Sequence, residues 1–364
     1  MKTVRKVREV GRREMGRQLT VVFAALAVST LAFTGLASAS VSSGRAVIGK
    51  VGATDAKAHT SATYKIGSVI CDTTNPFWAA EGAGEKAQAK SLGMGFTLLT
   101  GNNAGTVSLP QQIADIQTFI SEKVSVILVT ASDSIGIEGA VARANAAGIP
   151  VIAVNSPVGT VKGASSVDTG SAKVVSFVGA DNKAYGAAEG ALVVKALGGK
   201  GNVAMIHGTL GTEMDSQRFS GVLSVFKKHP GIHVIATMDD NWTNTMNITD
   251  VQDLLVKYPG TKLSAVMADG PEMYAGANYA RSHGNKTIKF FAGDYTTEVK
   301  TAIENGALVG TVDQSPGLEG QIGVQYAYDY LTGAKSKISA PTDFIPLPLV
   351  TKANVHKMKA LWSS

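Results

Sequence analysis

Polar and aromatic side chains collect where the apolar runs of this sequence end. Carboxylates, amides and one arginine follow seven such runs, and two of the three tryptophans lie among them. Carboxylates, amides and guanidinium groups hold neighbouring hydroxyl groups in forked hydrogen bonds, and aromatic rings cover apolar C–H faces. The residues selected on this basis are Asn75, Phe77, Trp78, Asn155, Arg218, Trp242, Asp269, Asp294 and Gln314, with Asp72, Ser156 and Gly270 as secondary candidates.

Each of these residues also has an ordinary structural explanation. An Asp or Asn at the start of a helix commonly caps that helix, and a phenylalanine such as Phe77 commonly belongs to an apolar core. Capping alone does not account for such residues after seven successive apolar runs. The pattern favours a site for a hydroxyl-rich ligand, while a structural role stays open for each single residue.

The sequence offers little that would support catalysis. His229 and His233 are separated by Pro230 and Gly231, which break a helix, so the two histidines do not form a helical metal-binding pair. The G-x-G-x-x-A match at residues 82–87 lies inside a predicted helix, whereas a dinucleotide loop follows a strand. We therefore predict no catalytic residue, no metal and no cofactor, and keep a secreted carbohydrate-modifying enzyme as the alternative.

Alternating strands and helices must position the selected side chains. Short β-branched runs alternate with helical patterns, which is typical of βαβ units and of parallel sheets covered on both faces. The predicted strands are 65–70, 96–100, 124–130 and 149–154 in a first series, and 174–179, 202–207, 232–237, 263–268 and 287–293 in a second. The predicted helices are 76–93, 108–123 and 136–148 in the first series, and 182–197, 213–228, 243–258, 271–284 and 297–306 in the second.

Two series of this kind predict two similar open sheets. Ligands of open α/β sheets bind beyond the carboxyl ends of the strands, and two such domains that face each other create a cleft. The looser segment 156–173, which is rich in Gly and Ser, separates the series and is interpreted as a mobile surface loop.

The first 39 residues have the three parts of a secretory signal peptide. A basic stretch precedes an apolar run at 21–36, and the sequence ASA ending at Ala39 is a small-x-small cleavage site. The alternative is a membrane anchor, for which an apolar run of about 16 residues is short. We expect cleavage after about Ala39, whether translation begins at Met1 or Met15, and a flexible leader at 40–63.

Most of the formal charge of +6 belongs to this N-terminal segment. Residues 1–39 hold seven of the 34 basic and two of the 28 acidic residues, so the rest of the chain has a net charge of +1. A near-neutral body lacks the basic surface of a nucleic-acid-binding protein. With 45% hydrophobic residues and a single cysteine, Cys71, the chain fits neither a disordered protein nor a disulfide-stapled one. No cysteine stands at the cleavage site to carry a lipid anchor.

Several stretches together resemble the ribose-binding branch of the periplasmic sugar-binding proteins of ABC transporters. They are NPFW, GTEMDSQRFSGV, NWTNTMNITDVQDLL, DGPEMYAGA, AGDYTTEV and DQSPGLEGQIG, and the resemblance covers about residues 64–352. It implies an α/β fold of two similar doubly wound parallel-sheet lobes joined by a three-strand hinge, the type I periplasmic binding protein fold. The implied crossovers lie near Ala180, Gln314 and Ile345. Lobe 1 would then comprise 64–180 plus 315–345, and lobe 2 would comprise 181–314 plus 346–364.

The resemblance also implies a function. A protein of this family is the substrate-binding component of an ABC importer, and here it would be a periplasmic monomer without a lipid anchor. It would deliver a neutral monosaccharide or polyol to a permease, with a ligand-binding sensor that feeds a chemoreceptor as a further alternative. A repressor of the lactose-repressor family resembles the same two lobes, but it would need a helix-turn-helix where residues 1–63 show a signal and a leader.

Matched by position, seven of the selected residues take ligand-contact roles in this resemblance. Arg218 matches the hydroxyl-binding arginine of lobe 2, Trp242 its aromatic wall, and Asp294 a carboxylate that takes paired hydroxyls. The other four are Asn75, Phe77 and Trp78 as contacts and walls of lobe 1, and Gln314 as an amide near the last crossover.

Two departures from the family pattern leave the identity of the sugar open. Asn155 and Ser156 stand where ribose binders carry an Asp-Arg pair, so both charges are absent. Gly270 stands where a ligand-binding Asn is usual, and the neighbouring Asp269 is placed to compensate for it. A polyol or a monosaccharide other than ribose fits these changes equally well.

Overall fold

The computed structural model describes residues 64–103, 106–163, 166–210 and 212–364. The predicted signal peptide and leader, 1–39 and 40–63, lie outside the described residues. In the described part, no helix combines the length and the apolar character that crossing a bilayer requires. Cys71 directly follows the first strand and is buried.

The first sheet has six strands, all parallel, in the order β15-β9-β6-β5-β1-β2. Helices α1, α2, α3 and α9 pack against it, and we call this sheet with its helices lobe 1. The strands are β1 (Lys65–Ile70), β2 (Gly95–Thr100), β5 (Val126–Val129), β6 (Val151–Val154), β9 (Phe177–Gly179) and β15 (Thr342–Phe344). The helices are α1 (Pro76–Ser91), α2 (Leu109–Glu122), α3 (Glu138–Ala146) and α9 (Pro316–Leu331).

The second sheet also has six strands, in the order β11-β10-β12-β13-β14-β16, and only β16 runs antiparallel to its neighbour. We call this sheet, helices α4 to α8 and the following segment 352–364 lobe 2. The strands are β10 (Gly201–His207), β11 (Ile232–Asp239), β12 (Ala265–Ala268), β13 (Lys289–Gly293), β14 (Gly310–Val312) and β16 (Leu349–Thr351). The helices are α4 (Asn182–Leu197), α5 (Glu213–Phe226), α6 (Asn244–Lys257), α7 (Met273–Ser282) and α8 (Thr297–Glu304).

Local chemistry explains where the helices begin. The side chains of Asn75, Ser108, Asp181, Thr212, Thr243 and Thr296 each accept a hydrogen bond from a backbone N–H of the first turn. Pro76 also stands at the first position of α1, where a missing N–H costs nothing. These caps explain why several predicted helix starts agree with the structure to within one or two residues.

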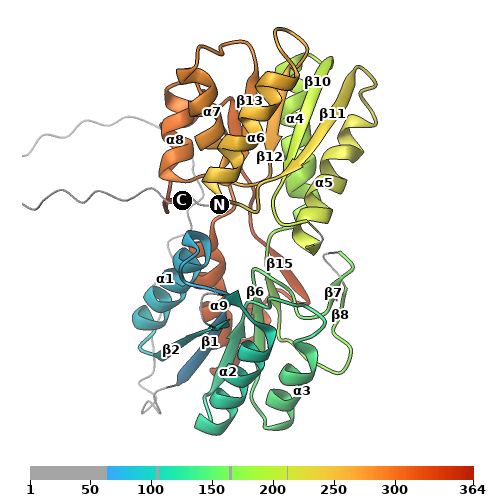
Figure 1. The fold of residues 1–364 in the computed structure, drawn as a ribbon. Coiled ribbons are helices and arrows are strands. Elements are labelled where there is room, and N and C mark those ends of the chain that lie inside the picture. The colour runs from blue at the N-terminus through green and yellow to red at the C-terminus, as the bar shows by residue number, and fades with distance from the viewer. Residues whose placement is uncertain (1–63, 104–105, 164–165, 211) are drawn as a thin grey trace, which may run out of the picture. The chain divides into compact units, whose positions relative to one another are not determined.

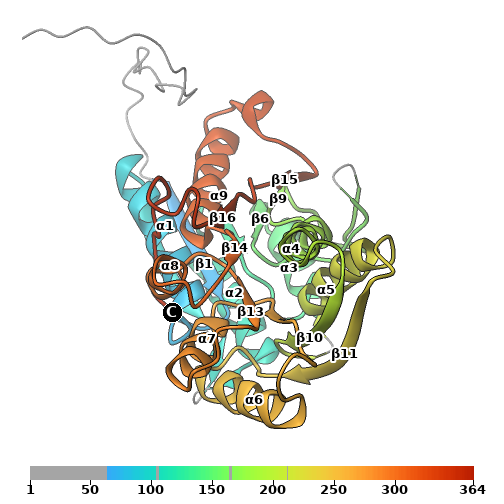
Figure 2. The same ribbon diagram turned by 90° about the horizontal axis from the view of Figure 1, so that it is seen from above.

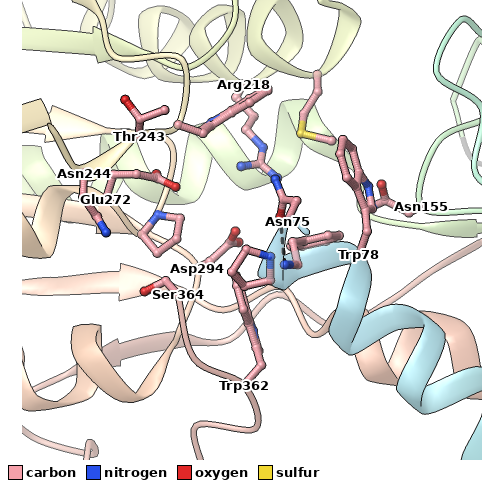
Figure 3. A pocket seen from close by; sticks show the side chains of 15 residues that line it. Asn75, Trp78, Asn155, Arg218, Thr243, Asn244, Glu272, Asp294, Trp362 and Ser364 are labelled. Carbon is pink, nitrogen blue, oxygen red and sulfur yellow. Dashed lines mark hydrogen bonds between the residues drawn. The ribbon is translucent and has the colours of Figure 1, made fainter. Parts of the chain in front are cut away.

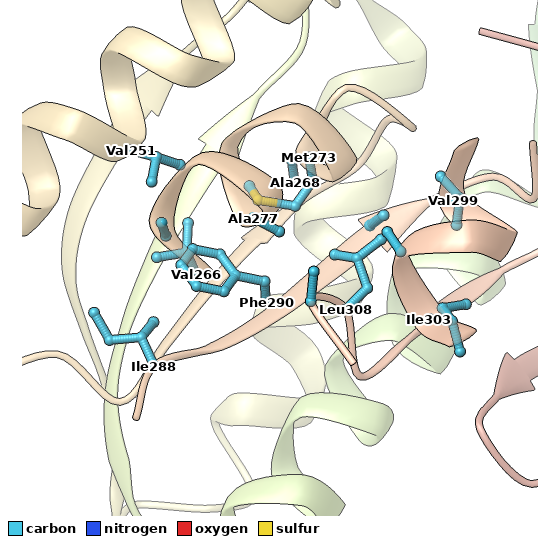
Figure 4. Close-up of a cluster of buried hydrophobic side chains, with 14 of the residues drawn as sticks. Val251, Val266, Ala268, Met273, Ala277, Ile288, Phe290, Val299, Ile303 and Leu308 are labelled. Atoms are coloured by element: carbon cyan, nitrogen blue, oxygen red, sulfur yellow. The ribbon is translucent and has the colours of Figure 1, made fainter. Parts of the chain in front are cut away.

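Each lobe has its own apolar cores, because the central strands are buried on both faces. In one core of lobe 2, Val266 of β12 and Phe290 of β13 pack with Val251, Ala277 and Ile303 from the covering helices (Figure 4). In lobe 1, α1 and α9 lie side by side although they are far apart in the sequence (Figures 1 and 2).

The chain passes between the two sheets three times. It leaves lobe 1 between β9 and α4, returns between β14 and α9, and crosses again between β15 and β16. These passages lie next to the positions implied by the family resemblance, Ala180, Gln314 and Ile345.

Two expectations differ from the structure. The run at 174–179 was grouped with the second series, yet β9 pairs with β6 and β15 in the first sheet. An apolar run shows that a strand is buried and does not show which neighbour it pairs with. The segment 156–173 contains a hairpin of β7 (Thr160–Val161) and β8 (Val167–Asp168), so it is not simply a loop. A second small hairpin, β3 (Asn102–Asn103) with β4 (Thr106–Val107), and the 3-10 turn η1 (Lys335–Lys337) complete the elements.

Candidate functional site

A cavity of about 310 Å³ is lined by residues of both lobes (Figure 3). Lobe 1 contributes one end of α1 and the loop after β6, and lobe 2 contributes several strand-to-helix junctions. The lining residues of lobe 1 are Asn75, Pro76, Phe77, Trp78 and Asn155. Those of lobe 2 are Met214, Arg218, Trp242, Thr243, Asn244, Pro271, Glu272, Asp294, Trp362 and Ser364.

The first turn of α1 brings two aromatic rings to the pocket. Asn75 is the N-cap of α1, and its Oδ1 accepts a hydrogen bond of 2.9 Å from the backbone N–H of Phe77. This bond fixes the start of the helix, and Phe77 and Trp78 follow directly. Asn75 therefore caps α1 and also lines the pocket, so its capping role does not exclude a ligand contact.

Arg218 is the centre of a buried hydrogen-bond network in lobe 2. Its side chain is 2% exposed, and its guanidinium carbon lies 3.9 Å from the centre of the Tyr185 ring. Nε donates to Asn182 Oδ1 at 3.2 Å, and Nη1 donates to the backbone oxygen of Asp269 at 2.7 Å. Nη2 donates to Gln314 Oε1 at 2.5 Å. The protein itself thus uses a donor on each of the three guanidinium nitrogens, so Arg218 positions the site as well as lining it.

This network continues into lobe 1 through Glu319 of α9. Gln314 Nε2 donates to Glu319 Oε1 at 2.8 Å, and Asn155 Nδ2 donates to Glu319 Oε2 at 3.0 Å. Burial raises the pKa of Glu319 to about 8, although these two bonds act to lower it. The line from Asn155 through Glu319 and Gln314 to Arg218 therefore connects the two lobes beside one of the chain passages.

Two buried carboxyl groups lie near the guanidinium. Burial raises the pKa of Asp269 and of Asp294 to about 6, and the Arg218 charge opposes this rise. The Tyr185 hydroxyl donates to Asp294 Oδ1 at 3.1 Å and accepts from the Asp294 backbone N–H at 2.7 Å. Asp294 is thereby held in the left-handed backbone region, with φ at 52°, where its side chain lines the pocket.

The loop that carries Trp242 is also strained. Asn241 and Trp242 have φ values of 48° and 53°, which few non-glycine residues adopt. The Asp240 carboxylate stabilises the loop, because Oδ1 accepts from the Trp242 backbone N–H at 2.8 Å and Oδ2 accepts from Asn247 Nδ2 at 2.7 Å. A Cβ atom on Gly208 would lie 2.0 Å from Trp242 Cε2, so this glycine makes room for the indole ring.

The structure brings seven of the nine main candidates to the pocket and places the others around it. Asp269 and Gln314 do not line the pocket but bond to Arg218 behind it. The secondary candidates do not line it either. Asp72 accepts bonds from the backbone N–H and the hydroxyl of Thr74 in a turn, and Ser156 lies 3.5 Å from Asn155 Oδ1.

Gly270, the third secondary candidate, matters because it has no side chain to occupy the space between Glu272 and Trp242. A Cβ atom on it would lie 2.2 Å from Glu272 Oε2 and 2.7 Å from Trp242 Cδ1. The absent side chain therefore allows Glu272 and Trp242 to approach each other at the pocket. Burial raises the pKa of Glu272 well above its ordinary value.

Sequence reasoning missed several residues of the site. Glu272 follows the predicted strand 263–268 within the stretch DGPEMYAGA, so both its place after a strand and the family resemblance could have indicated it. Glu319 lies within DQSPGLEGQIG, where the resemblance was the signal. Thr243 is the N-cap of α6 and Asn244 is its first residue, so their sequence pattern indicated a helix start and not a position at the pocket. Trp362 and Ser364 follow the last strand, where no predicted strand-to-helix junction pointed to them.

Comparison with known proteins connects this geometry to a family. The family model described as a periplasmic binding protein domain matches residues 66–335. The ribose import binding protein of Bacillus subtilis is 28% identical over 280 residues, which are 76% of this chain and 86% of the relative. The xylitol-binding protein of Mycolicibacterium smegmatis is 28% identical over 309 residues, covering 84% and 81%. A solved ABC transporter solute-binding protein of Bacillus halodurans with bound myo-inositol matches with a TM-score of 0.70 and 26% identity, covering 81% of this chain and 96% of that one.

Proposed function

This chain belongs to the periplasmic binding protein domain family, and from this premise we propose that it is the substrate-binding component of an ABC importer. It binds a neutral monosaccharide or polyol in the pocket between its lobes and delivers it to a permease. The proposal is supported by its similarity to a ribose import binding protein, a xylitol-binding protein and an ABC transporter solute-binding protein with bound myo-inositol. We also propose a periplasmic location, which would follow from export by the predicted signal peptide at 1–39 and its cleavage after about Ala39.

The composition of the pocket wall carries this proposal. Four aromatic side chains, Phe77, Trp78, Trp242 and Trp362, line the same cavity as amide, carboxyl and hydroxyl groups. Aromatic faces suit the C–H surface of a carbohydrate, and planar polar groups suit its hydroxyls. A volume of about 310 Å³ is at the small end of the range for ligand pockets, which favours a single sugar ring or a short polyol.

A hinge motion would link binding to delivery. We propose that lobe 1 comprises 64–180 plus 315–345, that lobe 2 comprises 181–314 plus 346–364, and that the three passages act as the hinge. A ligand that touches both lobes favours the closed arrangement, so a permease can distinguish the loaded protein by its shape. A chemoreceptor would be able to read the same difference.

A thermal-shift panel tests the proposal. The mature protein is melted with D-ribose, xylitol, myo-inositol and D-glucose, and with D-glucuronate as the anionic control. A ligand present at 100 times its Kd adds about 2.7 kcal/mol of stability, so a true ligand raises Tm clearly. D-Glucuronate should give no shift, because the carboxyl groups of Glu272 and Asp294 line the pocket and the nitrogens of Arg218 already bond to the protein. If no neutral sugar or polyol raised Tm, the proposed function would be wrong.

A further inference from the structure

The segment that follows the last strand is anchored to lobe 2. The backbone oxygen of Trp362 accepts a hydrogen bond of 3.0 Å from the backbone N–H of Thr297, at the start of α8. Two residues later, the backbone N–H of Ser364 donates to Glu298 Oε2 at 3.0 Å. These bonds fix segment 352–364 on the N-terminal end of α8, so Trp362 has a defined place in lobe 2.

From this place Trp362 reaches the other lobe. Its ring packs edge to face against Phe77, with centroids 5.5 Å apart and planes at 88°. Phe77 belongs to the first turn of α1 in lobe 1, and both rings line the pocket; Figure 3 labels Trp362 there. The aromatic contact therefore joins the two lobes at the ligand cavity.

The indole nitrogen of Trp362 has a further property. The residue is only 9% exposed, and within the described residues its Nε1 has no hydrogen-bond partner. A buried N–H normally finds an acceptor, and a hydroxyl of a ligand in this cavity would supply one. Trp362 also stands outside the four apolar cores, while the adjacent Leu361 is 69% exposed. Core packing therefore does not explain why this large side chain is buried here.

We propose that Trp362 is a ligand-contact residue that also holds the lobes together. Its indole N–H donates to a hydroxyl of the bound sugar or polyol, and its packing on Phe77 favours the closed arrangement of the lobes with or without that ligand. This inference rests on the proposed function, and it makes segment 352–364 a wall of the binding site.

Two substitutions separate the two roles. Trp362→Phe keeps an aromatic ring against Phe77 but removes the N–H donor, and Trp362→Ala removes both. Leu361→Ala is the matched control, because it alters the exposed neighbour on the same segment. Calorimetric titration with D-ribose, xylitol and myo-inositol measures Kd, and melting without ligand measures stability.

We expect Trp362→Phe to weaken binding by about 3- to 10-fold, the usual effect of one hydrogen bond, with Tm close to that of the wild type. Trp362→Ala should weaken binding further, because it removes the packing on Phe77 as well as the N–H donor. Leu361→Ala should bind like the wild type. Wild-type affinity in both Trp362 variants would overturn the inference while leaving the proposed function standing.

A separate measurement covers the case in which no panel compound binds the wild-type protein, which would count against the proposed function. Small-angle X-ray scattering of the ligand-free protein then compares the wild type with Trp362→Ala. A larger radius of gyration in the variant supports the contact between the lobes, and an unchanged radius overturns it.

Discussion

Replacing Arg218 with methionine removes the positive charge from the buried network and keeps much of the side chain's volume. The variant loses the bonds to Asn182, the Asp269 backbone and Gln314, together with the contact on the Tyr185 ring. Asp269 and Asp294 then stay buried without their cation. We therefore expect Arg218→Met to destabilise the protein as well as weaken ligand binding.

The size of the loss follows from the buried carboxyl groups. Removing one partner of a buried ion pair typically costs about 3–5 kcal/mol. Even with Arg218 present, burial raises the pKa of Asp269 and Asp294 from 3.8 to about 6. That interval corresponds to about 3 kcal/mol for each carboxyl when it is ionised. Without Arg218 both pKa values rise further, so ionising the two groups at neutral pH becomes more costly.

The raised pKa values of Asp269 and Asp294 set the sign with which the effect of Arg218→Met on stability depends on pH. A carboxyl whose pKa is raised in the folded state favours folding below its unfolded pKa of about 4, and this contribution is lost as the pH rises through about 6 and above. The penalty of Arg218→Met should therefore be large at pH 7.5 and smaller at pH 5.0, where the two carboxyls are mostly protonated.

Urea unfolding at these two pH values tests this reasoning, with Arg143→Met as the control. Arg143 is exposed on α3, and within the described residues its side chain donates a hydrogen bond to the backbone oxygen of Gly139 in its own helix. We expect the free energy of unfolding to fall by about 3–5 kcal/mol at pH 7.5, by clearly less at pH 5.0, and little in the control. An equal loss at both pH values, or none, would refute the account of Arg218 as the cation that stabilises these carboxyls.

The remaining predictions concern glycines that permit close approach. Gly208→Ala should displace the Trp242 ring, because the new Cβ would lie 2.0 Å from Trp242 Cε2. Calorimetric titration should then show weaker binding of any sugar that raises the wild-type Tm. Unchanged affinity would mean that the Trp242 ring does not contact the ligand. Gly84→Ala should lower Tm, because its Cβ would lie 2.2 Å from the Gly317 oxygen where α1 meets α9, and such overpacking costs about 1–3 kcal/mol. Gly139→Ala is the control for both, because this position on α3 is exposed and the nearest atom to the new Cβ would be Arg143 Nη1 at 3.8 Å, an ordinary contact. An equal or higher Tm is expected there. A Tm for Gly84→Ala that matches this control would contradict the helix contact.

Local sequence patterns were sufficient to predict the alternation of strands and helices and the part of the candidate site that the start of α1 carries. The spacing of apolar residues and the residues that cap helices involve only a few neighbouring positions, so both can be recognised in the sequence. Asn75, Phe77 and Trp78 were found together because one helix start carries all three. Trp242 and Asp294 follow the carboxyl ends of β11 and β13, and Arg218 lies in α5, the helix that follows β10, so all three were indicated by the edge where open sheets bind ligands.

The contacts of these residues depend on the three-dimensional fold. The pairing of β9 with β15 joins segments that lie more than 160 residues apart, and local pattern carries no information about such a partner. The same holds for Glu319, which meets Asn155 across 164 residues, and for Trp362, which meets Phe77 although no predicted element placed them together. Folding also changes the chemistry of the site. Burial raises the pKa values of Asp269 and Asp294, and the Arg218 nitrogens donate hydrogen bonds to the protein itself. Residue types indicated a hydroxyl-binding site, but the folded chain determined which donors and acceptors remain for a ligand.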